Sequence, residues 1–565
     1  MAFDKYSASK RMETNKLSWL LALLLFIQSN GFGQSTAKYL VLLRDKTNSP
    51  YSVSKPEQFL SARSIQRRQK QNIAVQERDL PVNPAYITQI QQAGGKVWFP
   101  SRWLNAVLVE VSDATLATIQ SLPFVKGIEF GRALDKTQSI TEPRVKSVSK
   151  FGSARLAADT LNYGSSANQI TQLGVDKMHQ RGYHGEGMLI GVLDAGFRFA
   201  DKVRFLKPLF DEKRVLATYD FVAKETGVYE DDDHGLEALS AIAATADKQL
   251  YGTAYKASFI LLRTEDAPTE KQVEEANWLF GAEYADSAGV DVISSSLGYF
   301  DFDNASTNYT YQNMDGKTTL STRAAQIATE TGIVVVVAAG NEGNDTWHYI
   351  DAPADAASVL SIGAVTQTGQ RASFSSFGPS ADGRIKPDLA ARGEGVMLGL
   401  ATDIIGLGNG TSFATPLVAG LVAGFWQSQP TLTAAQVTDL MRQSGSQFNK
   451  PDNSLGYGIP NFERASALAN PAAPLAVDPG VISLLVFSNP FSDQKPLSVQ
   501  LNGLNANTAV TASLADLNGR VLWQNRFTAL TQTTFVLPSL GLSTGEYVMT
   551  IVAGDRKRTL KVVKQ

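Results

Sequence analysis

The most regular pattern in this chain is a set of short, nearly continuous apolar runs separated by longer segments with helical periodicity. Such runs suit strands that are buried on both faces, as in parallel sheets covered by helices. They lie between residues 161 and 470, at 188–193, 259–262, 290–295, 333–338 and 359–364. Helices are predicted between them, for example at 272–287 and 319–331. The pattern predicts an α/β unit, a parallel sheet with helices on both faces, whose chemistry lies at the carboxyl ends of the strands.

Two smaller regions flank this unit. Residues 35–135 mix strand and helix patterns and predict a small α+β domain. Residues 481–565 carry short alternating strands, with a hairpin signal at Asn518-Gly519, and predict a small all-β sandwich. The polar segment 136–160 and the proline-rich segment 471–480 are predicted to be linkers.

The segment 1–34 has the order of a secretory signal peptide. Three basic residues, Lys10, Arg11 and Lys16, precede an apolar run at 17–27, and small and polar residues follow it. Cleavage is expected near Gly33. An uncleaved membrane anchor is the alternative, but a spanning helix needs about 20 apolar residues and this run is shorter. We therefore expect an exported protein.

Composition and charge exclude several classes of function. The 565 residues include 52 Lys and Arg against 54 Asp and Glu, a net charge of -2. Without a basic excess, the chain lacks the electrostatic footprint of a nucleic-acid-binding protein. Cysteine is absent, which excludes disulfides, thiolate metal sites and a cysteine nucleophile. The four histidines include no pair with the i, i+4 spacing of a helical zinc motif.

A serine at the start of a predicted helix is the first candidate for chemistry. Ser412 follows Gly408-Asn-Gly-Thr and precedes an apolar helical run, a place where serine is also a good N-cap. The N–H groups at a helix N-terminus can instead stabilise a developing oxyanion. A hydroxyl is a poor nucleophile without a base. His234, in Asp231-Asp-Asp-His-Gly, is the candidate base, although a lone histidine also fits a surface or core position and the acidic run fits a solvated loop or a bound cation.

Two further candidates follow predicted strands. Asp194 ends the strand 189–193 and could orient the histidine, although acids at strand ends are also common turn formers. Asn341 follows the strand 333–337 through Ala338-Ala-Gly. An asparagine beside glycine is typical of a turn, but its amide could also donate to an oxyanion.

Taken together, these segments resemble the motifs of the subtilisin-like serine proteases, the subtilases. The motifs occur in the family's order, Asp then His then Ser. They are Gly191-Val-Leu-Asp194-Ala-Gly, His234-Gly235, Ala338-Ala-Gly-Asn341-Glu-Gly and Gly410-Thr-Ser412-Phe-Ala-Thr-Pro-Leu-Val-Ala-Gly420. The resemblance implies a subtilisin-like fold over residues 161–470 and a serine endopeptidase that hydrolyses polypeptide substrates.

The resemblance also supplies roles for the candidate residues. Ser412 would be the nucleophile, His234 the general base and Asp194 the group that orients the histidine. Asn341 would bind the oxyanion with the Ser412 backbone N–H. Substrate would pair with the main chain of two segments. These are Ser296, Leu297 and Gly298 on one side and Ala339 and Gly340 on the other.

The sequence departs from the family at two places. The family has Thr and His after the His-Gly pair, whereas this chain has Leu236 and Glu237. Counting from the downstream proline, Asp351 falls on the wall of the specificity pocket, where it would favour Lys or Arg before the scissile bond; an exposed loop acid is the alternative. No cofactor is expected, and although calcium is common in the family, no ligand set can be mapped here.

The flanking regions resemble domains that accompany secreted subtilases. The segments Arg102-Trp-Leu-Asn-Ala-Val-Leu-Val-Glu-Val and Leu122-Pro-Phe-Val-Lys-Gly-Ile-Glu make residues 35–135 resemble the propeptide, an intramolecular inhibitor and folding chaperone. We expect self-processing within residues 132–165; an unrelated binding domain is the alternative.

Residues 481–565 resemble the sorting domain of type IX secretion cargo, which implies the outer-membrane secretion machinery as a partner and an extracellular or cell-surface location. The segments that carry this resemblance are Ser488-Asn-Pro490, Leu517-Asn-Gly519-Arg-Val, Leu540 to Gly545-Glu-Tyr547 and Lys561-Val-Val-Lys564. A substrate- or carbohydrate-binding β-domain is the alternative.

Two other functions compete with the endopeptidase. A catalytically silent subtilase scaffold would only bind protein, but all four catalytic positions are filled here. A dinucleotide-binding domain is disfavoured because no Gly-x-Gly-x-x-Gly follows a first strand. The sequence does not identify the physiological substrate, the exact processing sites or the oligomeric state.

Overall fold

The computed structural model describes residues 35–136, 161–469 and 483–565, the last with short gaps at 488, 494–495, 503–507, 530–531, 539 and 555. The predicted signal peptide and nearly all of both predicted linkers lie outside the described residues. Contacts divide the chain into two units, one formed by the segments Met1–Pro50 and Pro81–Glu142 and the other by Tyr51–Leu80 and Pro143–Gln565.

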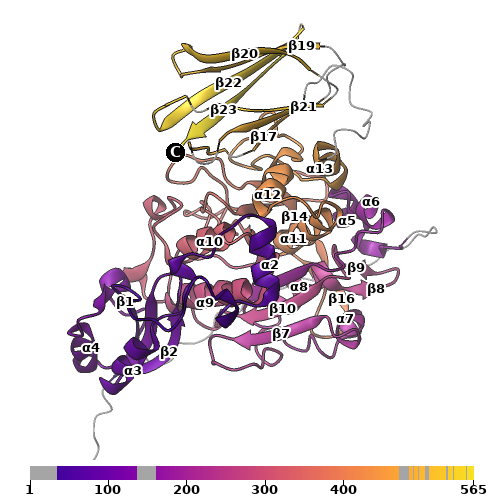
Figure 1. The fold of residues 1–565 in the computed structure, drawn as a ribbon. Coiled ribbons are helices and arrows are strands. Elements are labelled where there is room, and N and C mark those ends of the chain that lie inside the picture. Colours follow the sequence, from indigo (N-terminus) through magenta and orange to yellow (C-terminus); the bar gives the residue numbers. More distant parts are fainter. Residues whose placement is uncertain are drawn as a thin grey trace, which may run out of the picture. The chain divides into compact units, whose positions relative to one another are not determined.

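A seven-stranded parallel sheet forms the centre of the larger unit, in the order β14-β13-β12-β11-β6-β10-β7 (Figure 1). The predicted parallel sheet is therefore confirmed. Its strands are β6 (Leu189–Asp194), β7 (Val215–Asp220), β10 (Ser258–Arg263), β11 (Val292–Ser295), β12 (Val334–Ala338), β13 (Leu360–Val365) and β14 (Leu389–Arg392). Every residue of β6 is buried, as its uninterrupted apolar sequence requires.

Helices cover both faces of this sheet. The long helix α11 (Thr411–Ser428) packs along β11, β12, β13 and β14 and shares a core with Ile190 and Val192. The intervening Gly191 faces the other way, because a Cβ added there would lie 3.7 Å from the Cβ of Ala285 in α9 (Val273–Ala288). Alternate residues of β6 thus contact helices on opposite faces. The remaining helices of this region are α5 (Ala167–Gln172), α6 (Val175–Gln180), α7 (Lys207–Asp211), α8 (His234–Ala243), α10 (Leu320–Glu330), α12 (Ala434–Gln443) and α13 (Phe462–Ala469).

Two short antiparallel ribbons lie outside the central sheet. The ribbons pair β8 (Thr245–Ala246) with β9 (Leu250–Tyr251) and β15 (Val396–Gly399) with β16 (Ile405–Gly408). Among the described helices, none combines the length and the apolar character needed to cross a bilayer.

The smaller unit has the α+β character predicted for residues 35–135, but the segment Tyr51–Leu80 of that range belongs to the larger unit. Its antiparallel sheet has the order β2-β3-β1-β4, with β5 also paired to β1. Helices α3 and α4 supply Ile90 and Ile119 to the core beneath the sheet, and both side chains are fully buried. The elements are β1 (Ala37–Leu43), α3 (Pro84–Gln92), β2 (Lys96–Ser101), β3 (Ala106–Val111), α4 (Asp113–Gln120), β4 (Val125–Ile128) and β5 (Asp135–Lys136).

The C-terminal region consists of two antiparallel sheets, ordered β17-β18-β21 and β20-β19-β22-β23. Burial alternates along β19 and β22, so one face of their sheet lines a core. The predicted hairpin at Asn518-Gly519 joins β19 to β20, with Gly519 at a φ of 84°. The strands are β17 (Ser483–Phe487), β18 (Ser498–Asn502), β19 (Thr508–Ala515), β20 (Val521–Ala529), β21 (Gln532–Val536), β22 (Gly545–Ala553) and β23 (Arg556–Lys564).

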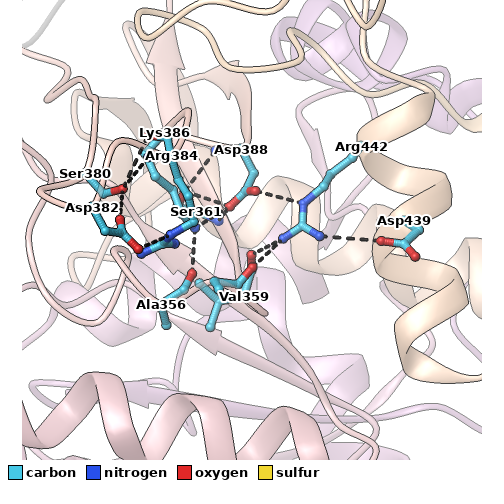
Figure 2. A network of polar contacts seen from close by, with 11 residues as sticks. Ala356, Val359, Ser361, Ser380, Asp382, Arg384, Lys386, Asp388, Asp439 and Arg442 are labelled. Atoms are coloured by element: carbon cyan, nitrogen blue, oxygen red, sulfur yellow. Dashed lines mark hydrogen bonds and ion pairs between the residues drawn. The ribbon is translucent and has the colours of Figure 1, made fainter. Parts of the chain in front are cut away.

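A buried ionic network fixes α12 to the ends of β13 and β14 (Figure 2). The Asp388 carboxylate accepts from Lys386 Nζ at 2.6 Å and from Arg442 Nε at 2.8 Å. It also accepts from the main-chain N–H of Ser361 at 3.0 Å. Burial opposes ionisation of Asp388, but Arg442 and Lys386 outweigh it and lower the pKa of this carboxyl to about 2. The network therefore carries a carboxylate that stays ionised inside the protein.

Candidate active site

A histidine and an aspartate meet at the carboxyl end of β6. Asp194, the last residue of that strand, is fully buried, and His234 is the first residue of α8. The distance from His234 Nδ1 to Asp194 Oδ1 is 2.6 Å. A Cβ at Gly235 would lie 2.3 Å from the carbonyl oxygen of Gly196, so only glycine lets α8 begin this close to the end of β6.

This contact determines the tautomer and the charge of the imidazole. A carboxylate only accepts hydrogen bonds, so Nδ1 carries the proton and Nε2 is the free acceptor of the neutral ring. Burial alone would lower the pKa of His234, but Asp194 outweighs burial and raises it to about 9, with smaller contributions from Glu237 and Asp232. Burial in turn raises the pKa of Glu237 from 4.5 to about 7. The histidine thus lies in a markedly anionic environment.

Ser412 is the second residue of α11, at the same rim of the sheet. Its main-chain oxygen accepts from the Ser296 hydroxyl at 2.7 Å, which ties the start of α11 to the end of β11. The ring of the next residue, Phe413, lies 5.4 Å from the His234 ring between centroids. The hydrogen bonds of the described residues do not include one between the Ser412 hydroxyl and His234; such contacts often tighten only when substrate binds.

Asn341 lies beside the start of the same helix. It follows β12 through Ala339 and Gly340, the latter at a φ of 113°. The Asn341 side-chain oxygen accepts from the main-chain N–H of Thr411 at 2.8 Å, and the Thr411 hydroxyl lies 3.1 Å from the same oxygen. A main-chain N–H can only donate, so the oxygen faces Thr411 and the NH₂ group is directed elsewhere. Thr411, which the sequence analysis did not assign, therefore orients Asn341.

The two segments expected to bind substrate lie on either side of Asp351. A Cβ at Gly298 would lie 2.9 Å from the Asp351 Cβ, and a Cβ at Gly340 would lie 2.4 Å from an Asp351 carboxylate oxygen. Trp347 Nε1 donates to the other carboxylate oxygen at 2.9 Å. The Asp351 residue is only 3% exposed, so the alternative of an exposed loop acid is wrong.

A second acid, Glu342, lies beside Asp351. Burial raises the pKa of Asp351 well above its usual range, and the neighbouring Glu342 raises it further. A Cβ at Gly340 would also lie 2.7 Å from a Glu342 carboxylate oxygen. The sequence analysis did not single out Glu342, although its position directly after Asn341 was visible. The two acids are therefore packed closely against Gly340, and the raised pKa favours the neutral form of Asp351.

The acidic run before His234 takes part in ion pairs. Asp231 and Asp233, from the run before His234, form ion pairs with Arg263 and Arg198 at 3.4 and 2.8 Å. Among the described residues, three carboxylates have oxygens within 4.8 Å of one another. They belong to Glu265, Glu270 and Glu274. Burial raises the pKa of Glu274 well above its usual range, and the nearby Glu265 carboxyl raises it further. Proximity of carboxylates alone does not define a cation site.

Comparisons with known proteins agree with this geometry. A model of the subtilase family matches residues 185–458, and a model of the peptidase S8 propeptide domain of Bacteroidota matches residues 38–146. The chain is similar to a subtilisin of Bacillus pumilus, with 31% identity over 317 residues, 55% of this chain and 100% of that protein. It is also similar to subtilisin E of Bacillus subtilis strain 168, with 29% identity over 373 residues, 65% of this chain and 82% of that protein.

The protein is thus a hydrolase of the serine-type endopeptidase class. The chain belongs to the subtilase family and carries a propeptide domain of the kind found in peptidases of this family.

Proposed function

We propose that this chain is a secreted serine endopeptidase, made as a self-processing zymogen, with Asp194, His234 and Ser412 as its catalytic triad. The observation that carries the proposal is the 2.6 Å contact from His234 Nδ1 to Asp194, at the sheet rim where Ser412 lies in the first turn of α11. The contact leaves His234 Nε2 as the acceptor. Nε2 would take the hydroxyl proton as Ser412 attacks the scissile carbonyl, and would then give it to the leaving amine.

The oxyanion of the tetrahedral intermediate would be stabilised from two sides. The Asn341 NH₂ group donates from one side, since Thr411 already occupies its oxygen. The Ser412 main-chain N–H donates from the other, at the positive end of an 18-residue helix. Water then hydrolyses the acyl-enzyme with His234 again as the base.

The substrate is proposed to bind as an extended strand. Ser296, Leu297 and Gly298 follow the end of β11 and offer main-chain groups on one side, and Ala339 and Gly340 offer them on the other. Pairing of this kind recognises the main chain and tolerates many sequences, so we assign selectivity to the side of the site that carries Asp351.

Covalent labelling tests the triad directly. A fluorophosphonate probe should label wild-type protein at Ser412 and leave the Ser412→Ala variant unlabelled. Ser428→Ala, at the other end of the same helix, is the matched control and should label normally. A wild-type protein that binds peptides but takes no label would favour the silent scaffold.

Self-processing is the second part of the proposal. Residues 35–135 would act as an intramolecular inhibitor of the catalytic region 161–470, and the cut would fall in or near the linker 136–160. Full-length Ser412→Ala protein should therefore remain uncut when expressed alone. A variant that matured at the wild-type position would show that another protease makes the cut.

Export forms the third part. The segment 1–34 would direct the chain across the inner membrane, and residues 481–565 would present it to the outer-membrane type IX machinery for release or surface attachment. The two antiparallel sheets suit a compact recognition domain. A chain truncated at Pro471 should accumulate inside the cell envelope. Normal secretion of that chain would favour a substrate- or carbohydrate-binding role for the domain.

A further inference from the structure

One segment of the propeptide region is folded against the catalytic region instead of its own domain. The segment Tyr51–Leu80, here called the arm, lies inside the range 38–146 matched by the propeptide model but clusters with the catalytic unit. Its helix α2 (Ala62–Lys70) packs on α9 (Figure 1). The Ser61 hydroxyl caps α2 at Ser64, and the Ser61 N–H donates to Ser287 of α9 at 2.9 Å.

Basic and amide side chains of the arm bind carbonyl oxygens at and just beyond the C-terminal ends of α9 and α10. Arg63 Nε donates to Gly289 at 2.9 Å, and Arg67 Nη1 donates to Val290 at 2.5 Å. Arg67 Nε also reaches the carbonyl oxygen of Thr331, directly after α10, at 3.3 Å. The last carbonyls of a helix lack intrahelical partners and carry the negative end of its dipole. Cationic donors are therefore well matched to this surface.

A buried carboxylate lies at the centre of the contact. Asp286 of α9 is fully buried and forms ion pairs with both Arg67 and Arg68 of the arm. The distance from Arg68 Nη2 to the carboxylate is 2.8 Å. Asp79, also in the arm, holds the Arg68 guanidinium through two contacts of 3.1 and 3.2 Å. Asp79 of the arm thus holds the Arg68 side chain in position to bind Asp286 of the catalytic region.

The surfaces also fit closely in shape. A Cβ at Gly289 would lie 2.7 Å from the Cβ of Arg63, and one at Gly332 would lie 2.7 Å from the Gln71 amide nitrogen. Gln71 donates to the Gly332 carbonyl at 2.8 Å and accepts from the N–H of Ala434, at the start of α12, at 2.8 Å. One side chain therefore joins the end of α10 to the beginning of α12.

We infer that the C-terminal ends of α9 and α10 form an exosite, centred on Asp286, for a helix of the pattern Arg-x-x-x-Arg-Arg-x-x-Gln. The arm occupies this exosite and holds the propeptide on the catalytic region after the linker has been cut. The partners described for the arm do not include Asp194, His234 or Ser412, so the anchor is separate from the catalytic groups. The idea that the propeptide stays on the catalytic region after the cut rests on the proposed zymogen function, whereas the binding of the arm to the exosite does not.

The test separates binding from self-processing by using an external cut. The full chain carries Ser412→Ala and a recognition sequence for a site-specific protease inserted in the linker 136–160. After cutting, the dissociation rate of the propeptide from the tagged catalytic region is measured. Arg67→Gln should speed dissociation about 10- to 100-fold, because it removes one partner of a buried charge pair. Arg63→Gln, with its side chain 41% exposed, should speed it about 3- to 10-fold.

Lys70→Gln is the matched control, since it removes the same charge from an exposed position of the same helix and should dissociate like the parent. Equal retention by the parent, Arg63→Gln and Arg67→Gln would overturn the inference. If Arg67→Gln fails to fold, Arg63→Gln decides the result alone, because its loss leaves no buried charge. Absence of fluorophosphonate labelling or of self-cutting would refute the proposed function and leave this result unaffected.

Discussion

The main-chain N–H of Thr411 donates to the side-chain oxygen of Asn341 at 2.8 Å, and so determines that the NH₂ group of that amide is directed away from Thr411. If the NH₂ group stabilises the oxyanion, Asn341→Leu should lower kcat about 100- to 1000-fold with little change in KM, a magnitude that derives from the subtilisins themselves. Steady-state kinetics on a peptide anilide would measure both constants. A rise in KM of similar size, with kcat unchanged, would indicate a role in ground-state binding instead.

Thr411 gives a graded companion to this experiment. Thr411→Val keeps the main-chain N–H but removes the hydroxyl that lies 3.1 Å from Asn341, whereas Thr411→Ser keeps both. The valine variant should lose about 3- to 10-fold in kcat, because one neutral hydrogen bond is lost. The serine variant should match wild type. Identical kcat values for all three proteins would show that the N–H alone orients Asn341.

The pH profile should report the anionic surroundings of His234. A general base must be neutral, and the pKa of His234 is raised to about 9, so kcat/KM should still be rising above pH 7. Glu237→Gln removes a negative charge, which lowers the pKa of His234 and should move the acid limb about 0.5–1 unit toward lower pH. Glu237→Asp keeps the charge and should leave the limb in place. An unchanged limb in Glu237→Gln would show that this carboxyl does not act on the histidine.

Asp351 should determine which residue precedes the scissile bond. A Lys or Arg side chain beside Asp351 would bring a cation to a carboxyl whose pKa is raised by burial and by Glu342. Preference for basic over apolar peptides should therefore increase with pH, as Asp351 ionises. Asp351→Gly and Asp351→Asn should lower that preference about 10-fold or more. Equal turnover of basic and apolar peptides by wild type and Asp351→Gly would remove this assignment.

The Asp388 network should matter for stability and not for chemistry. Asp388→Asn leaves Lys386 and Arg442 without their carboxylate and should lower the free energy of unfolding by about 3–5 kcal/mol. Asp382→Asn breaks a more exposed ion pair with Arg384 and should cost about 1 kcal/mol or less. Urea unfolding of the two variants measures the contrast. Equal midpoints would mean that the buried network contributes no more than the exposed pair.

The lowered pKa of Asp388 predicts how the stability of the folded protein changes in acid. The pKa of Asp388 in the folded protein is about 2, below the usual 3.8. The stabilisation is therefore fully present above the usual value and is lost as the pH falls from 3.8 toward 2. Wild type should lose stability in this window more steeply than Asp388→Asn, which has no carboxyl to titrate. Parallel pH profiles would contradict the assignment.

Some strands were predictable from the sequence because both of their faces are buried. The apolar runs at 188–193 and 333–338 needed no other information, and the strands β6 and β12 lie within them or one residue beyond. The strand β7 was not predicted. It lies at the edge of the sheet, where Leu216 is 58% exposed, so its sequence lacks the uninterrupted apolar run of a central strand.

The candidate site was predictable as far as its residues follow strands or begin helices. Asp194 and Asn341 came from that rule, but the orientation of Asn341 depends on Thr411, 70 residues later in the chain. The arm shows the same limit. Nothing in the local sequence of α2 indicates that Arg67 and Arg68 are buried, because charged side chains are rarely buried without a partner and only the fold supplies that partner.

The helix that begins with Thr411 and Ser412 is buried from its first residue to Trp426. Segments with so much buried surface open only when the whole domain unfolds. Heating or denaturant should therefore not displace the Ser412 hydroxyl, our proposed nucleophile, through local opening of a loop. Loss of activity and loss of the native core should instead occur in one cooperative transition, with the amides of this helix among the slowest in the molecule to exchange with solvent.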